Sequence, residues 1–142
     1  MISPKRAVQH LGRLTVNPIV LALIRSGIPL PGIGRKTVMS LTTVGRKSGK
    51  PRVTPMGYVR IDENTVWAVS EHGDRSDWYR NARAAGTVQV QAGGDRPRRA
   101  TVRLLPEEDP AAVLKRMHPM VAIANRALWD RPAVVEIRFE ND

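Results

Sequence analysis

The chain has 142 residues, of which 42% are apolar, and its formal net charge is +10. This length and apolar content are typical of one folded domain with a single core, and they exclude global disorder. There is no cysteine, which excludes disulfides and thiolate metal sites, and no apolar run reaches the roughly 20 residues that span a bilayer.

The N-terminal part predicts a poorly ordered or loosely docked segment over residues 1–14, followed by a helix. Asn17 is a favourable helix cap, Pro18 suits the first helical position, and Gly27 ends the helix. This helix is apolar over most of its surface and arginines flank it, so it either packs over the rest of the domain or rests on a membrane surface. Residues 28–34 read as an apolar linker because prolines and glycines interrupt any helix there.

The rest of the chain alternates β-branched and apolar runs with turn residues, which predicts strands joined mainly by short turns. Six strands are expected, over residues 37–44, 53–61, 65–70, 87–92, 96–105 and 133–140. Three helices are expected, over residues 77–85, 106–117 and 120–128. Asp77 would cap the first of these helices and Gly86 would end it, while acidic residues would fill the first turn of the second.

This order of elements predicts an α+β fold that is mainly β: a six-stranded, mostly antiparallel barrel, closed or split, with peripheral helices. We expect a single domain over residues 1–142, with the N-terminal helix and linker in residues 1–34 and the barrel in residues 35–142.

The turn between the first two expected strands is strongly basic. Gly45 and Gly49 permit positive φ angles and leave backbone N–H groups open, and Ser48 adds a hydroxyl donor. A phosphate or a carboxylate would be held well there, although charged hairpin tips are often merely solvated. The cations of this turn are Arg46, Lys47, Lys50 and Arg52.

Three motifs occur in order: Thr-Thr-Val-Gly-Arg-Lys-Ser-Gly-Lys-Pro-Arg at 42–52, Ser-Glu-His-Gly at 70–73, and Trp-Tyr-Arg-Asn at 78–81. Together they resemble the deazaflavin-dependent nitroreductase family, and the similarity runs from about residue 17 to residue 90. The resemblance implies a split β-barrel of the kind that binds flavins. It also implies coenzyme F-420, a deazaflavin with a phosphate and a polyglutamate tail. Members of that family pass a hydride from reduced F-420 to quinones, nitro compounds or other unsaturated acceptors.

The resemblance also implies which residues contact the cofactor. The basic turn would hold the phosphate and the tail carboxylates, and the strand that follows would run beside the ring system. Pro55 has no N–H to donate, so this strand is expected at a sheet edge or to be irregular there. The expected contacts are Arg46, Lys47, Ser48, Lys50, Arg52, Thr54, Pro55, Met56, Ser70, Glu71, His72, Gly73 and Trp78.

Three of the candidate residues have an ordinary alternative. His72 is the one candidate for a proton-transfer role, and a surface position is its alternative. Trp78 would lie near the cofactor, and Trp129 would line the acceptor pocket, but core packing also accounts for large aromatic side chains.

Two other function classes are weighed against an F-420-dependent reductase. One is a non-catalytic protein of the same fold that binds or carries F-420, FMN or heme. The other is nucleic-acid binding, which the charge suggests but the scarcity of aromatics among the basic strands disfavours. Three scattered histidines give no metal-binding spacing. We expect a small-molecule electron acceptor as the partner and a monomer or a homodimer as the assembly. A cytoplasmic location is expected, and contact with a membrane is left open.

Overall fold

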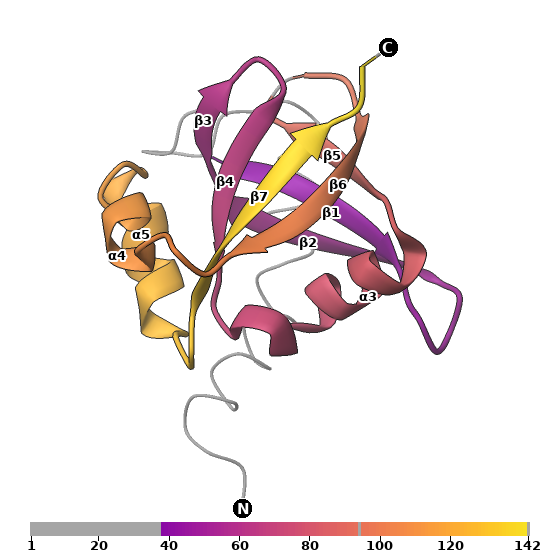
Figure 1. Ribbon diagram of the computed structural model, residues 1–142, viewed down its shortest axis with the longest axis horizontal. Coiled ribbons are helices and arrows are strands. Elements are labelled where there is room, and N and C mark those ends of the chain that lie inside the picture. Colours follow the sequence, from indigo (N-terminus) through magenta and orange to yellow (C-terminus); the bar gives the residue numbers. More distant parts are fainter. Residues whose placement is uncertain (1–37, 94, 142) are drawn as a thin grey trace, which may run out of the picture.

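Seven strands form one antiparallel sheet in the computed structural model, which describes residues 38–93 and 95–141 (Figure 1). The sheet order is β2-β1-β5-β6-β7-β4-β3, and every neighbouring pair is antiparallel. The strands are β1 (Val38–Val44), β2 (Pro51–Gly57), β3 (Val59–Asp62), β4 (Thr65–Ser70), β5 (Val88–Ala92), β6 (Arg98–Leu105) and β7 (Ala133–Phe139). The helix and linker predicted within residues 1–34 lie outside the described residues.

The predicted fold class, a mainly β α+β split barrel, is confirmed, but the expected number of strands is wrong. The single strand expected over residues 53–61 is two strands, β2 and β3, separated by Tyr58 alone. β2 pairs with β1 at one edge of the sheet, and β3 pairs with β4 at the other edge. The alternation of polar and apolar residues along the sequence does not reveal this change of pairing partner. It indicates which side chains are buried and not which strand lies alongside.

The helices are η1 (Gly73–Arg75), α3 (Asp77–Ala85), α4 (Pro110–Leu114) and α5 (Pro119–Ala127). Gly86 ends α3 with φ 86°, as predicted. The cap position of α3 is Ser76 rather than Asp77, and the Ser76 hydroxyl makes no capping bond because it lies 2.6 Å from the Ser70 hydroxyl.

The helix expected over residues 106–117 is much shorter. Asp109 caps α4 by accepting a hydrogen bond from the Ala111 N–H at 3.0 Å, and Pro110 takes the first helical position. Asp followed by Pro is a stronger start signal than the acidic residues before it, which form a turn outside the helix.

Hydrophobic side chains pack on both faces of the sheet. One cluster, here called the inner cluster, includes Met39, Leu41 and Ile137 from the strands, and α3 adds Trp78, Tyr79 and Ala82 to it. A second cluster joins the other face to α4 and α5; its buried members are Val59, Val69, Leu105, Val113, Leu114, Met117 and Val134. A fully buried Val or Leu side chain contributes about 1.5–3 kcal/mol, and α4 supplies two of them, Val113 and Leu114. α5 adds Val121 and Ala122, which are partly buried against the same cluster.

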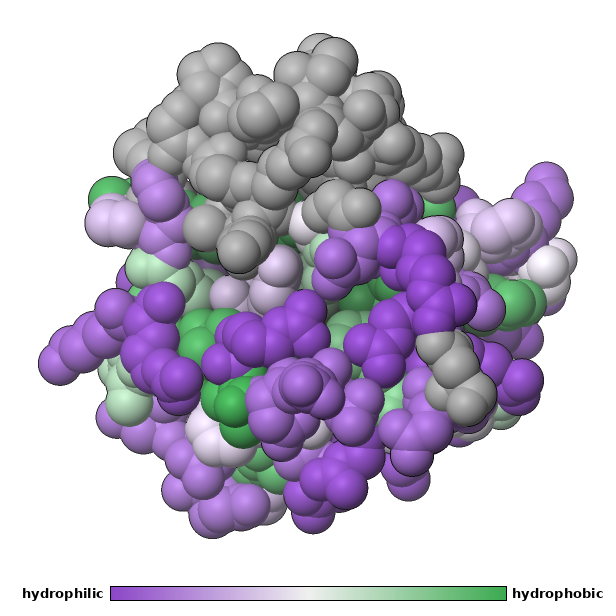
Figure 2. Space-filling model, turned by 90° about the horizontal axis from the view of Figure 1, so that it is seen from above, coloured by the Kyte–Doolittle hydropathy of each residue, from purple (hydrophilic) through white to green (hydrophobic). Residues whose placement is uncertain are grey.

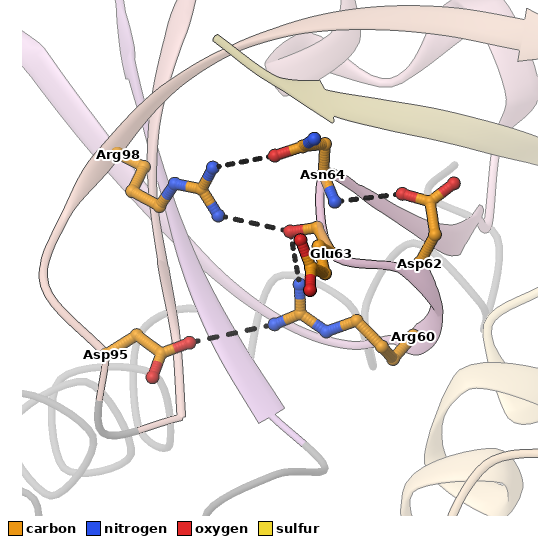
Figure 3. A network of polar contacts seen from close by, with 6 residues as sticks. All are labelled: Arg60, Asp62, Glu63, Asn64, Asp95 and Arg98. Atoms are coloured by element: carbon orange, nitrogen blue, oxygen red, sulfur yellow. Dashed lines mark hydrogen bonds and ion pairs between the residues drawn. The ribbon is translucent and has the colours of Figure 1, made fainter. Parts of the chain in front are cut away.

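A polar network holds the β3–β4 turn (Figure 3). Guanidinium groups of Arg60 and Arg98 both donate to the Glu63 carbonyl oxygen, at 3.4 and 3.3 Å, and Arg98 also donates to Asn64 Oδ1 at 3.2 Å. Arg60 pairs with Asp95 at 3.6 Å. In Figure 1 this turn lies at the top, whereas the β1–β2 hairpin projects at the lower right.

Candidate functional site

The β1–β2 hairpin has a tight, internally bonded tip. The Gly45 N–H donates to the Lys50 carbonyl oxygen and the Gly49 N–H donates to the Gly45 carbonyl oxygen, both at 2.8 Å. Gly49 has φ 70°, as the turn requires. A Cβ at Gly45 would lie 2.6 Å from Ser48 Oγ, so only glycine fits there without a shift.

Three of the four cations at this tip have no partner in the part of the chain that the structure describes. Lys47, Lys50 and Arg52 are exposed, and their side chains make no hydrogen bond or ion pair within residues 38–93 and 95–141. Ser48 Oγ accepts a hydrogen bond from the Lys50 N–H at 3.2 Å, which leaves the Ser48 hydroxyl hydrogen to donate elsewhere. The tip can therefore offer three cations and one hydroxyl to an anionic ligand.

Arg46, the fourth cation, is bound by helix α3. Its backbone N–H and its Nη1 donate to the same oxygen, Asn81 Oδ1, at 3.1 and 2.8 Å. Its Nη2 lies 3.4 Å from Asp77 Oδ1. These contacts join the first and third sequence motifs, and the expected cofactor contact by Arg46 competes with them.

β2 leads away from the hairpin along the edge of the sheet, as the position of Pro55 predicts. Arg52, Thr54 and Met56 alternate with their neighbours, so they share one face of the strand. Met56 packs against the inner cluster, while Pro55 belongs to the opposite face. A ligand lying along this edge would meet a cation, a hydroxyl and a thioether in succession.

The four residues of the Ser-Glu-His-Gly motif, which lie at the end of β4 and in the loop after it, differ in burial. Ser70 is fully buried, and its hydroxyl lies 2.8 Å from the Gly73 carbonyl oxygen. Gly73 is buried with φ 58°, and a Cβ there would lie 2.7 Å from the Arg131 carbonyl oxygen. Glu71 and His72 are half-buried, so within this motif only they present side chains toward the surface.

The tryptophans of the candidate site are core or half-buried residues. Trp78 and Tyr79 are 5% and 8% exposed, and their rings meet edge to face with centroids 6.0 Å apart. Both belong to the inner cluster, and core packing is the alternative given above for Trp78. Trp129 is half-buried, and its Nε1 donates to Asn125 Oδ1 at 2.6 Å.

Asn81 and Asn125 have larger roles than the sequence indicated. Asn125 is 7% exposed and donates from Nδ2 to the Val69 carbonyl oxygen at 3.1 Å and to Glu71 Oε1 at 3.3 Å. It thereby ties α5 and Trp129 to the end of β4. An amide in the midst of apolar residues was the one available signal, because a buried polar side chain needs partners.

A surface hollow of about 420 Å³ lies away from these residues, beside the β3–β4 turn. Its lining, which includes Asp62, Glu63 and Arg138, contains none of the predicted site residues. Figure 2 shows the molecule from above, with hydrophilic residues over most of the described surface and only small hydrophobic patches between them.

Two further classes of site can be judged for the described part of the chain. Its acidic and histidine side chains form no group of three or more that could hold a metal ion. None of its helices has the length and apolar content that a transmembrane span requires.

Comparisons with known proteins agree with this architecture. A family model described as F420H(2)-dependent quinone reductase matches residues 23–137. A solved F420-H2 dependent reductase, FDR-A, is 29% identical over 74% of this chain and 95% of that chain, with a TM-score of 0.50.

Two more distant structures share the fold. One is described as an F420 reductase and is 20% identical, covering 75% of this chain and 89% of that chain with a TM-score of 0.52. The other is the heme storage protein HutZ from Vibrio cholerae, which is 13% identical, covering 75% of this chain and 84% of that chain with a TM-score of 0.54.

Proposed function

Because the chain belongs to the F420H(2)-dependent quinone reductase family, we propose that it binds reduced coenzyme F-420 and passes a hydride from it to a quinone, a nitro compound or another unsaturated acceptor. The observation that carries the proposal is the hairpin tip, where Lys47, Lys50 and Arg52 stand exposed without partners among the described residues. Exposed cations in such a group favour a ligand with several negative charges.

The tip fits the phosphate and polyglutamate tail of F-420 better than it fits a neutral ligand. Each exposed cation–anion contact contributes up to about 1 kcal/mol, so three of them strengthen binding on the order of 100-fold. Ser48 adds a hydroxyl donor, and the absence of a Cβ at Gly45 leaves room for Ser48 Oγ at its observed position. In this proposal Arg46 supports the tip while the other three cations and Ser48 contact the ligand.

The ring system would lie along β2, beside Thr54 and Met56. An edge strand has backbone N–H and C=O groups without a ladder partner, which can orient the polar edge of a flat ligand. The deazaflavin supplies the hydride when it is bound, and the protein positions its reactive carbon and keeps water away. His72 is half-buried in the loop after β4, and in this proposal it is the candidate proton donor for the reduced acceptor.

A binding titration tests the cofactor assignment. We expect micromolar or tighter affinity for F-420, weaker affinity for FMN, and a loss of about 30-fold for F-420 in the Lys50→Ala, Arg52→Ala double variant. The matched control is Arg99→Ala, Arg103→Ala, which removes the same charge from exposed residues of β6 that pair with Glu140 and Glu136. Unchanged affinity in the hairpin variant would refute the assignment of the site.

A turnover assay separates a reductase from a carrier of the same fold. Oxidation of reduced F-420 is followed with a panel of quinones and nitro compounds. Oxidation above background with at least one acceptor is expected. Tight binding without oxidation of any acceptor would favour the carrier, and tight binding of heme instead of F-420 would favour a heme-binding protein.

A further inference from the structure

We propose, on the basis of the proposed function, that Asn81 is a positioning residue for cofactor binding: it holds the basic hairpin through Arg46 and does not contact the ligand itself. Asn81 is 5% exposed, and its Oδ1 accepts both the backbone N–H and the Nη1 of Arg46. The two residues are 35 positions apart in sequence, so this contact is a tertiary tie between the hairpin and α3.

The tie is strong because its helix side is rigid. Trp78, Tyr79 and Ala82 of α3 are buried in the inner cluster, so the helix that carries Asn81 is packed firmly on the sheet. The guanidinium contributes a charge-assisted bond, and the backbone N–H fixes the main chain of the tip as well as the side chain. Asp77, one turn earlier, lies 3.4 Å from the same guanidinium.

The tie has a direct consequence for the ligand cations. Lys47, Lys50 and Arg52 follow Arg46 in the hairpin, and their own side chains have no partner among the described residues to hold them. If the main chain of the tip is already held in one place, these cations lose less conformational entropy when the ligand binds. Without the tie, the same charges would be present but less well organised.

Amide hydrogen exchange of the cofactor-free protein tests the tie. In Asn81→Ala we expect exchange at the Gly45 and Gly49 amides to rise about tenfold, while the amide of Leu41 in the middle of β1 is unchanged. Asn81→Asp keeps an acceptor oxygen at the place of Oδ1 and should restore most of the protection. Arg83→Ala, an exposed change in the same helix, is the control and should leave exchange unaltered. Equal exchange in Asn81→Ala and the wild type would overturn the proposal.

Titration with F-420 tests the effect on binding. Asn81→Ala should weaken binding about tenfold, and most of this loss should disappear in the Arg46→Ala background, because Asn81 acts through Arg46. Full additivity of the two losses would show that Asn81 acts independently of Arg46 and would overturn the positioning role. Failure of the wild type to bind F-420 would instead overturn the proposed function, whatever the exchange result.

Discussion

Gly57→Ala is expected to destabilise the protein by about 2 kcal/mol. Gly57 is buried at the end of β2, beneath α5. A Cβ at this position would overlap Val121 Cγ1 and would come within 3.3 Å of Met117 Sδ. The clash involves a helix that is itself packed on the sheet, so relief requires α5 to shift outward or Val121 to leave its rotamer, and such overpacking typically costs about 1–3 kcal/mol.

The measurement is urea unfolding followed by far-UV circular dichroism, with thermal unfolding alongside. For a chain of this size, about 2 kcal/mol corresponds to a fall in Tm of about 8 °C. Val121→Ala alone removes part of a half-buried side chain and should cost about 1 kcal/mol. In the double variant the methyl group added at position 57 would occupy the space vacated by the Val121 side chain, so the two losses should not add.

We expect the double variant to be more stable than Gly57→Ala, which requires a coupling energy of more than about 1 kcal/mol. Two results would refute this reasoning. One is a Gly57→Ala protein as stable as the wild type, which would mean that α5 does not rest on β2. The other is a double variant whose loss equals the sum of the single losses.

Three more predictions concern the hairpin and two titrating groups. Gly45→Ala places a methyl group 2.6 Å from Ser48 Oγ and should weaken F-420 binding about tenfold in the same titration. Burial raises the pKa of Tyr58, so the folded protein retains a proton that the unfolded chain releases. The urea midpoint should therefore fall as the pH rises above about 10, and less so in Tyr58→Phe. The Asn64 N–H lowers the pKa of the Asp62 carboxyl, so NMR titration should find it below its usual value. The stability from this contact is present at neutral pH, should disappear as the pH falls through that pKa, and should be absent from Asp62→Ala.

The sequence was informative where local chemistry decides the structure. Strand alternation, the glycine turn at the hairpin and the stop at Gly86 all depend on neighbouring residues, and each is found in the structure. The position of Pro55 in an edge strand follows from its missing N–H in the same way.

Features that depend on distant partners could not be read from local patterns. The break at Tyr58 reflects a change of pairing partner, from β1 to β4. The tie of Arg46 to Asn81 spans 35 positions, so the four hairpin cations looked equivalent in sequence although one of them is occupied. Ser70 lies at the end of its strand as expected, but its hydroxyl is turned inward to Gly73 and Ser76, which no spacing rule indicates.

The single residue between β2 and β3 limits how the barrel can open. Consecutive Cα atoms are about 3.8 Å apart, so the end of β2 and the start of β3 can never separate by more than about 7 Å at Tyr58. Any widening between the two sheet edges must therefore pivot at that point, like a hinge. The edges can diverge toward the hairpin tip on one strand and toward the β3–β4 turn on the other, and a flat molecule admitted between them would have to enter from those open ends.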